Sequence, residues 1–478
     1  MIGLRSLQAA PRHRRYRLSI AACLLVGLWP GGRLQAADDP EYLKAESPLP
    51  ADLEEVGSPT DRLGLIPESG FDRYRPFRMG LGQSLRRVRA EILPPSGNAF
   101  LDDARFSLRP RFYYRNVDGW GDPGSRAAAL GGVLALESGW LAETLRISLA
   151  GYTSQRLHAS GEKGMSGLLG EDDGGYTVLG EAQVELKLDQ SALFVGRSRI
   201  DLPFINGNDT RMTPNTFEAI GVRTQGLQNM QLGFGHLTKI KSLDSSDFVS
   251  MSEQAGAPGS DRGVSVLGLR YNFSDDFHIA LVEEYGWDMF NTIYLESDRM
   301  FALTDDLNLR VGAQFTDQRS VGEALLGNFR TGSAGVKTAL GYKGLIASAS
   351  ATTTSDDAGI SKPWGGSPSF NSVMIADFDR AGENSIRLGT SFDFSRLGLD
   401  GLAADASWSY GDTPDGGPSA SPDQQELNLT VDIRPPIDHL ENFWLRVRYA
   451  VNERDSLGGS PSSERNDFRV ILNWSLSF

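Results

Sequence analysis

The chain ends in "RNDFRVILNWSLSF" (residues 465–478), where an apolar side chain occupies every second position from Phe468 to Phe478. Polar or charged residues fill the positions between them, and Ile471 is the one apolar exception. This alternation predicts a β-strand with one apolar and one polar face. Such a strand can pack its apolar face on the core of a β-sandwich, or it can turn that face to lipid in a membrane barrel.

The N-terminus has the order of segments that is typical of an export signal. Residues 1–17 are basic, residues 18–30 are mostly apolar, and small residues surround Ala36. The apolar core is shorter than the roughly 20 residues that a helix needs to span a bilayer. "SIAAC" resembles a lipoprotein cleavage box, but the apolar stretch continues beyond Cys23. We therefore predict that residues 1–36 are a cleaved signal peptide.

Cysteine, histidine and charge content exclude several classes of site. The one cysteine, Cys23, lies in the predicted signal peptide, so the exported chain would have no thiol for a disulfide or a metal. The five histidines form no spaced pair of the kind that binds zinc. Because residues 1–36 hold six arginines and no acid, their removal takes the formal net charge from -14 to -20. We predict no metal, no cofactor and no nucleic-acid partner.

The remaining chain has no apolar run long enough for a transmembrane helix, so it could cross a membrane only as a closed barrel. Alternating segments recur along it, among them "TLRISLAGY" (144–152), "EAQVELKLD" (181–189) and "WLRVRYAVN" (444–452). Each is close to the length of strand that crosses a bilayer at a tilt. Such segments between Ala104 and Phe478 number about eighteen, an even count as in bacterial barrels.

The connections between these segments alternate in length. Tight links lie at 188–191, 273–276, 303–306 and 342–344, and long polar stretches lie at 153–178, 199–216, 240–263 and 354–383. A sandwich has no reason to alternate in this way, whereas a barrel with short periplasmic turns and long outer loops does. We predict an all-β fold: a transmembrane antiparallel β-barrel of about eighteen strands over residues 100–478, with short periplasmic turns and long extracellular loops.

The two ends of this barrel carry further expectations. Residues 37–99 are rich in proline, acidic at first and then basic, and lack a strand pattern, so they are either a flexible periplasmic lead-in or a plug-like segment near the pore. Phe478 is expected at the periplasmic aromatic girdle. A terminal aromatic also resembles the signature that the barrel assembly machinery reads.

Strand parity predicts which charges face the interior. If the apolar residues face lipid, a basic set points inward, because a lipid-facing Arg or Lys costs about 2–4 kcal/mol at the bilayer midplane. That set is Arg109, Arg111, Arg115, Arg146, Lys239, Lys241, Arg310, Lys337, Arg387, Arg446 and Arg448. These side chains could select anions, or each could pair with an inward acid such as Glu181, Glu185, Asp393 or Asp432 and brace the wall.

Three stretches resemble the OprD-like substrate-specific porins of Gram-negative outer membranes. They are "FLDDARFSLRPRFYYRN" (100–116), "VGRSRIDLPFINGNDTRMTPNTFEAI" (195–220) and "DFDRAGENSIRLGTSFDFSRLGLDGL" (377–402). The resemblance implies an eighteen-stranded barrel, monomeric or loosely oligomeric, that is narrowed by inward loops. It also implies a basic ladder that guides small carboxylated solutes, with Arg197, Arg199 and Arg211 at or near the constriction.

The function that follows is passive, substrate-selective uptake of small anionic or zwitterionic solutes across the outer membrane. A general diffusion pore is the first alternative. An outer-membrane enzyme is a second, with His236 as its best-placed histidine, although no nucleophile motif stands beside it. An export partner of an inner-membrane pump is a third. The expected partners are outer-membrane lipid, the solutes and the barrel assembly machinery.

Overall fold

The computed structural model describes residues 96–478 except 121, 305, 438–439, 441 and 478. The predicted signal peptide, nearly all of the 37–99 segment and the terminal Phe478 lie outside the described residues. Expectations about them therefore stay predictions.

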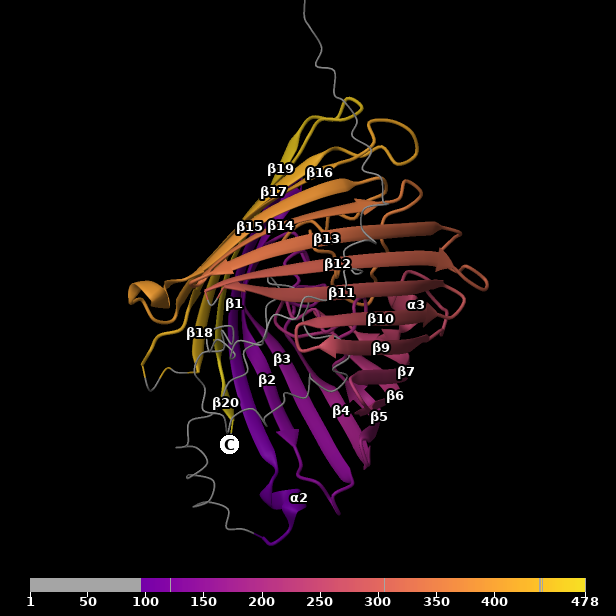
Figure 1. Cartoon of the computed structure of the whole chain (residues 1–478), viewed down its shortest axis with the longest axis vertical. Coiled ribbons are helices and arrows are strands. Elements are labelled where there is room, and N and C mark those ends of the chain that lie inside the picture. Colours follow the sequence, from indigo (N-terminus) through magenta and orange to yellow (C-terminus); the bar gives the residue numbers. More distant parts are fainter. Residues whose placement is uncertain (1–95, 121, 305, 438–439, 441, 478) are drawn as a thin grey trace, which may run out of the picture. The chain divides into compact units, whose positions relative to one another are not determined.

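Eighteen long strands follow one another around a single antiparallel sheet in the described residues (Figure 1). They are β1 (Arg105–Gly119), β2 (Asp122–Glu137), β3 (Leu145–Gly161), β4 (Tyr176–Leu188), β5 (Ser191–Ser198), β6 (Thr216–Leu227), β7 (Met230–Lys241), β9 (Val264–Ser274), β10 (Phe277–Gly286), β11 (Phe290–Thr304), β12 (Leu307–Ser320), β13 (Arg330–Tyr342), β14 (Leu345–Thr354), β15 (Asn384–Asp393), β16 (Leu402–Asp412), β17 (Gln424–Ile433), β18 (Phe443–Arg454) and β19 (Ser463–Trp474).

Short elements complete the chain. Strand β8 (Phe248–Ser250) pairs with the end of β7, and β20 (Leu476–Ser477) pairs with β1. The helices α2 (Ala99–Asp102) and α3 (Met251–Gln254) and the 3-10 helix η4 (Phe394–Leu397) have four residues each. None of the helices in the described part of the chain is long and apolar enough to cross a membrane.

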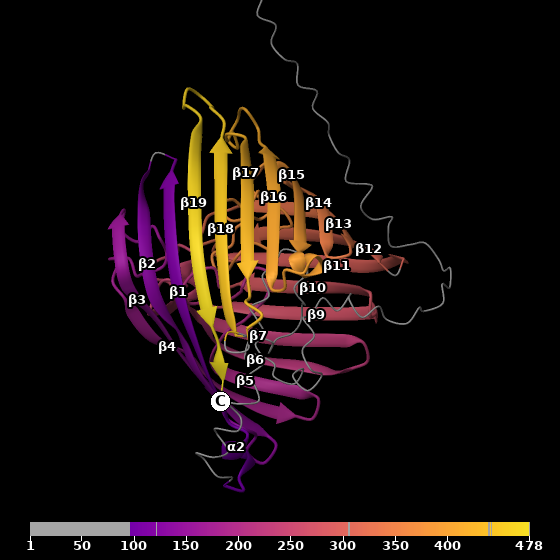
Figure 2. The same cartoon turned by 90° about the vertical axis from the view of Figure 1, so that its left-hand side faces the viewer.

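The sheet closes on itself because the last long strand pairs with the first. Register partners run from Arg111↔Asn473 to Gly119↔Arg465, so β1 and β19 share nine residue pairs. Figure 2 shows β19 between β1 and β18. The terminal strand predicted from the alternation is therefore the closing strand, and the predicted antiparallel barrel of eighteen strands is confirmed. Closure leaves no edge strand with unpaired backbone groups in lipid.

Side chains alternate between the interior and the outer surface along each strand. On β1, Tyr113, Arg115 and Val117 share the buried face, whereas Leu108 on the opposite face is 39 % exposed. Leu134 on β2 is 60 % exposed. The exposed apolar residues form the belt that faces lipid, and the polar residues turn inward, where they find hydrogen-bond partners.

The lengths of the connections differ in part from the predicted alternation. The first long outer loop covers residues 162–175 rather than 153–178, because β3 stays paired with β2 up to Ser125↔Gly161. The first outer link is only residues 120–121, and the periplasmic link that contains η4 is longer than a tight turn. The loops at 199–215, 242–263 and 355–383 are long, as expected.

These three long outer loops pack into the barrel instead of standing away from it. Trp364 of loop 355–383 is fully buried and stacks on Phe290 of β11, with ring centroids 5.2 Å apart. The Trp364 Nε1–H donates to the Met251 carbonyl at 2.8 Å. Ile205 of loop 199–215 belongs to the same buried apolar cluster. These loops therefore fold into the interior, where they share a buried apolar cluster with one part of the wall.

Candidate functional site

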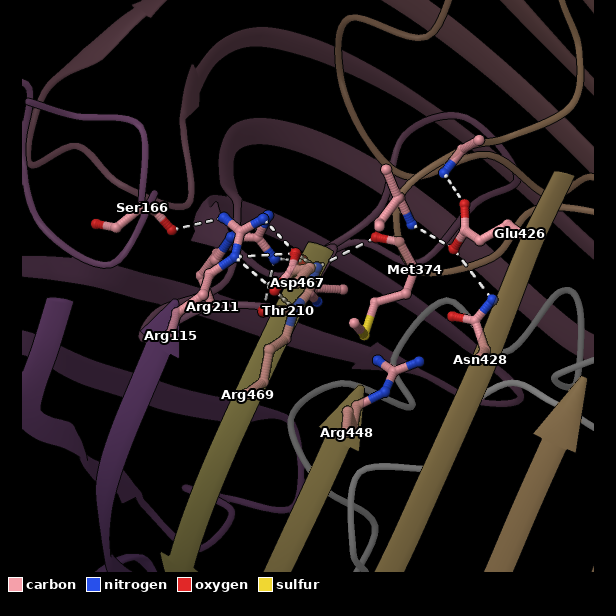
Figure 3. Close-up of polar contacts among 12 residues, drawn as sticks. Arg115, Ser166, Thr210, Arg211, Met374, Glu426, Asn428, Arg448, Asp467 and Arg469 are labelled. Atoms are coloured by element: carbon pink, nitrogen blue, oxygen red, sulfur yellow. Dashed lines mark hydrogen bonds and ion pairs between the residues drawn. The ribbon is translucent and has the colours of Figure 1, made fainter. Parts of the chain in front are cut away.

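A row of arginines crosses the interior of the wall where the barrel closes. Arg115 on β1 is the register partner of Arg469 on β19, and Arg469 is the partner of Arg448 on β18. Thr430 on β17 continues the row beside Arg448. Neighbouring strands lie about 4.8 Å apart, so three cationic side chains are concentrated at one height. Figure 3 shows Arg115, Arg469 and Arg211 of loop 199–215 around Asp467, with Arg448 on the neighbouring strand to one side of this group.

Asp467 is the counter-ion of two of these arginines. Its Oδ2 lies 2.6 Å from Arg115 Nη2 and 2.7 Å from Arg469 Nη2. Both arginines also donate from Nε to Oδ1, at 3.1 Å and 3.0 Å. The Asp467 carboxylate is fully buried, so these charge-assisted contacts are shielded from water. Two cations share one anion, and the group therefore retains a net positive charge.

The same arginines hold the inward loops. Arg115 Nη1 donates to the Ser166 carbonyl at 2.7 Å, and Arg469 Nη2 donates to the Met374 carbonyl at 3.1 Å. On β17, Glu426 accepts from the backbone N–H groups of Ile375 and Ala376 at 2.9 Å and 2.8 Å. Loops 162–175 and 355–383 are therefore fixed against the arginine-bearing wall by their backbone (Figure 3).

Arg211 and Arg448 differ from their neighbours because neither has a carboxylate partner within 4.0 Å among the described residues. Arg448 Nε donates to the Thr430 hydroxyl at 3.3 Å. Within the part of the chain that the structure describes, Arg211 Nη1 donates only to Thr210, and the buried Arg211 Nε has no hydrogen-bond partner. Burial, followed by the nearby charges of Arg115 and Arg469, lowers the pKa of Arg211 to about 9. These two guanidiniums are the ones most able to accept an external anion.

A second group of charges lies toward the periplasmic side of the row, where loop 199–215 meets β1. Arg111 Nη1 and Nη2 donate to the two Asp209 oxygens at 2.6 Å and 3.2 Å. Burial alone would raise the pKa of Asp209, but Arg111 and then Arg199 outweigh it and lower the pKa to about 2. Burial opposes ionisation of Arg199 as well, yet Asp201 and Asp209 raise its pKa. This group ties the loop to the first strand.

Several other predicted residues lie on inward faces but have acidic partners. Arg446 Nε and Nη2 donate to both oxygens of Asp432 at 2.6 Å and 2.7 Å. Arg310 Nε donates to Asp298 at 2.6 Å. Arg146 bridges Glu137 and Glu185, with N–O distances of 3.1 Å and 2.7 Å. These pairs match the wall-bracing alternative more closely than the anion-selecting one.

Two of the remaining inward residues contact loop 355–383, and a third lies lower on β1. Arg387 Nη1 lies 3.4 Å from the carbonyl oxygens of Phe370 and Ser372. The Lys337 ammonium lies 6.0 Å from the Phe370 ring centre. Arg109 is on the inward parity of β1, and its buried Nε has no hydrogen-bond partner. The arginine-bearing wall thus continues from Arg115 toward the periplasm.

Arg197 and Lys239 do not lie where the sequence predicted. Arg197 is on the same face of β5 as Val195, which is 49 % exposed, and its ion-pair partner is Glu218 on β6. Lys239 also pairs with Glu218. A register shift between β6 and β7 inserts Thr238 and turns Lys239 outward. Both cations therefore belong to the outer surface of the barrel and not to its interior.

Some residues of this region escaped the sequence analysis. Arg469 stands on the polar face of the closing strand, so the alternation in residues 465–478 already contained the signal for it. Asp209 and Asp467 needed tertiary contacts to be recognised as counter-ions. Lys241 was also predicted to face the interior. Its fully buried ammonium instead donates to the Thr213 hydroxyl and to the Ser242 carbonyl, and so connects loop 199–215 to the start of loop 242–263. The described residues contain no group of three or more potential metal ligands.

A closed eighteen-strand barrel whose outer loops fold inward onto a charged wall defines a porin-type channel. The chain belongs to the OprD family: it matches the family described as "outer membrane porin, OprD family" over residues 98–478. No curated protein sequence matches it. As a member of this family it is an outer-membrane porin of Gram-negative type.

Solved structures of the family have the same fold. The Pseudomonas aeruginosa channel OpdK, solved with vanillate, has 22% sequence identity and a TM-score of 0.71, covering 79% of this chain and all of OpdK. Pseudomonas aeruginosa OccK9 (OpdG) has 25% identity and a TM-score of 0.72, with 80% and 100% covered. Acinetobacter baumannii OccAB2 has 19% identity and a TM-score of 0.72, with 80% and 99% covered.

Proposed function

We propose that this porin takes up small solutes that carry a carboxylate, and that Arg211 and Arg448 bind that carboxylate transiently. The observation that carries the proposal is the pair of guanidiniums without a carboxylate partner among the described residues, placed beside the Arg115–Asp467–Arg469 group, in which two arginines share one carboxylate. The shared carboxylate fixes Arg115 and Arg469 in place, and Arg211 and Arg448 add positive charge to the excess that this group already has. A planar guanidinium can bind a carboxylate through two parallel hydrogen bonds.

The charges that line the interior support anion uptake, although the net charge of the whole chain is negative. The charge on the whole chain is -14, but potential at a given point depends mainly on charges within a Debye length, about 8–10 Å at ordinary salt. Acidic residues on distant loops therefore count for less than the arginines of the row. Cationic groups along a pore lower the barrier for anions by replacing part of their lost hydration.

The ligand of one structural relative also supports a carboxylate as the solute. OpdK was solved with vanillate, which is a small aromatic carboxylate. The low identity makes this support for a solute class and not for a particular solute. A general diffusion pore remains the alternative, since most inward arginines of this chain have acidic partners.

The enzyme alternative receives little support from the surroundings of His236. Its Nδ1 lies 3.0 Å from the Ser265 hydroxyl, but the same hydroxyl accepts from Trp287 Nε1 at 3.0 Å. Among the described residues, no carboxylate forms a hydrogen bond or an ion pair with this histidine, so the orienting acid of a hydrolase triad is missing there.

A reversal-potential measurement across a salt gradient tests the proposal. We expect anion preference in the parent protein and a clear loss of it, several-fold in the permeability ratio, in Arg448→Ala and in Arg211→Ala. Arg197→Ala is the matched control, since this arginine faces outward and should leave selectivity unchanged. Cation preference in the parent, or equal selectivity in all four proteins, would favour the general diffusion pore.

A further inference from the structure

The outward-facing cations at the outer rim form a site that channel function does not explain. Arg197, Glu218 and Lys239 are consecutive register partners across β5, β6 and β7. Arg197 Nη2 lies 3.0 Å from Glu218 Oε1, and Lys239 Nζ lies 3.8 Å from Glu218 Oε2. The side chains of Arg197 and Lys239 are 36 % and 45 % exposed. Two accessible cations therefore share one acid on the outer surface.

This row lies at the upper boundary of the lipid-facing belt. Directly toward the periplasm on the same face are Val195 and Ile220, followed one step lower on β7, below His236, by Phe234; the three apolar side chains are each about half exposed. In the other direction the strands end and the outer loops begin. This is the height of the lipid headgroups, where a charge on the outer face is tolerated better than at the midplane.

A second pair of outward-facing cations that share one acid lies elsewhere on the sheet, with its acid on the same strand as one of the cations. Arg319 on β12 and Arg330 on β13 are direct register partners on the outward face near the outer strand ends. Like charges in opposed positions destabilise a sheet, and here Asp317 lies between them as a shared ion-pair partner. The two arginine side chains are 50 % and 71 % exposed. Phe315, the next residue below Asp317 on the outward face of β12, is 46 % exposed.

We propose that each of these two cation pairs binds a phosphate group of an outer-leaflet lipid. Each pair has one acid for two cations, so a net positive charge and unused N–H donors face outward. A phosphate accepts bidentate hydrogen bonds from arginine and would relieve the repulsion between the paired cations. The apolar surface directly below each pair would contact the acyl chains of the same molecule. The occupant is therefore an anionic lipid with a phosphorylated headgroup.

The periplasmic rim provides the contrast. Arg299 on β11 also faces outward, but its register partners are Phe277 and Val311, so no second cation opposes it. Its guanidinium lies over the rings of Phe277 and Phe301, 5.5 Å and 4.8 Å from their centres. Arg197 also lies over a ring, 4.1 Å from the centre of Phe248, so the ring contact does not distinguish the two sites. Arg299 shares the outward direction and the residue type of the outer pairs but has no second cation opposite it, which makes it the matched control.

Binding of lipid A to the purified full-length protein in detergent micelles tests the proposal. Native mass spectrometry would measure the affinity of diphosphoryl lipid A and of the same glycolipid without phosphates. We expect the double variants Arg197→Gln/Lys239→Gln and Arg319→Gln/Arg330→Gln each to bind the diphosphoryl form about tenfold more weakly at the affected site, as loss of charge-assisted hydrogen bonds implies. Arg299→Gln should bind as the parent does.

Further arms separate the possible outcomes. The exchange Arg197→Lys/Lys239→Arg should retain binding, and heat-modifiable migration on a gel should show that every variant is folded. Inorganic phosphate at millimolar concentration should not compete, because it lacks the acyl chains. Parent-like affinity in both double variants, or equal binding of the phosphate-free glycolipid, would overturn the proposal. Full competition by inorganic phosphate would replace it by a free-anion site. The test is independent of the proposed solute, since neither pair faces the interior.

Discussion

Two parts of the barrel wall hold the inward loops by different physical means. The part built from β5–β7 and β9–β11 supplies a buried apolar cluster, in which Phe217, Val282 and Phe290 pack against Phe204 and Trp364 of the loops. The part built from β17–β19 and β1 supplies arginines, carboxylates and backbone contacts. One wall thus fixes the loops by excluding water, and the other by charge-assisted hydrogen bonds.

The two walls therefore have different roles: the apolar wall supports the loops, and the charged wall carries the positive charge that faces the interior. Apolar burial stabilises the loops without placing any charge on the solute path, so the charge can be concentrated on the opposite wall. Under the proposed function, an anion that enters the barrel is attracted most strongly by Arg211 and Arg448, beside the closing strand. We infer that a solute moves along this wall. The comparison predicts that changes on the apolar wall reduce stability, whereas changes on the charged wall alter selectivity.

The largest effect is expected from Trp364→Ala on the apolar wall. The side chain is fully buried, stacked on Phe290 and hydrogen bonded to Met251, so its truncation leaves a cavity and an unpaired carbonyl. Such changes cost about 3–5 kcal/mol. Loop 355–383 should then be packed less firmly against the apolar wall. The transition from the folded to the unfolded band on a denaturing gel should shift to lower temperature.

Trp287→Ala is the control for this change. Trp287 is half exposed on the outer surface, so its removal creates no internal cavity and should shift the transition much less. If both variants melted at the same temperature, the loops would not depend on the apolar wall for their position.

A somewhat smaller effect on stability, with a change in selectivity, is expected from Asp467→Asn on the charged wall. The substitution keeps the shape of the side chain but leaves Arg115 and Arg469 without their shared anion. Breaking a buried pair of this kind costs about 3 kcal/mol. The uncompensated arginines should raise the anion permeability ratio in reversal-potential measurements.

Asp432→Asn provides the comparison on the same wall, since Asp432 serves Arg446 and is less buried. Asp432→Asn should also lower the stability and raise the anion permeability ratio, but by less than Asp467→Asn. A fall in anion preference in Asp467→Asn would contradict the view that this acid neutralises part of the cationic row.

The sequence was sufficient for the barrel because its information is local. Period-two alternation marks each strand, and the apolar face of residues 465–478 marks the strand that closes the sheet on β1. Parity likewise placed Arg111, Arg115 and Arg448 on inward faces. These inferences need only the pleat of a strand, which turns successive side chains to opposite sides.

The parts that the sequence could not provide depend on contacts between distant segments. The register shift at Thr238 reverses the parity of Lys239, and nothing in "GHLTKIK" announces it. Arg197 was placed by resemblance, although its strand parity with Val195 turns it outward. The seating of Trp364 on Phe290 joins segments over 70 residues apart, so neither pattern nor composition could identify the wall on which the loops rest.

The smallest effect concerns pH and the contact of Asp379 with Lys362 inside loop 355–383. The Lys362 ammonium lies 2.8 Å and 2.6 Å from the two Asp379 oxygens and 3.3 Å from Asp377. Burial raises the pKa of Asp379; Lys362 opposes this and Asp377 adds to it, which leaves the pKa at about 6. Because this value is above the ordinary 3.8, protonated Asp379 stabilises the folded loop at low pH, and that contribution is lost as pH rises through about 6.

Loop 355–383 should therefore be held slightly more firmly at pH 5 than at pH 7, by about 1 kcal/mol. Hydrogen exchange of its amides at the two pH values, corrected for the intrinsic rate, measures the difference. In Asp379→Asn the difference should vanish. In Asp377→Asn it should move to lower pH, because removal of the neighbouring like charge lowers the pKa of Asp379. An unchanged pH dependence in Asp379→Asn would show that another group titrates. The Asp379–Lys362 contact would then not contribute to the pH-dependent stability of the loop.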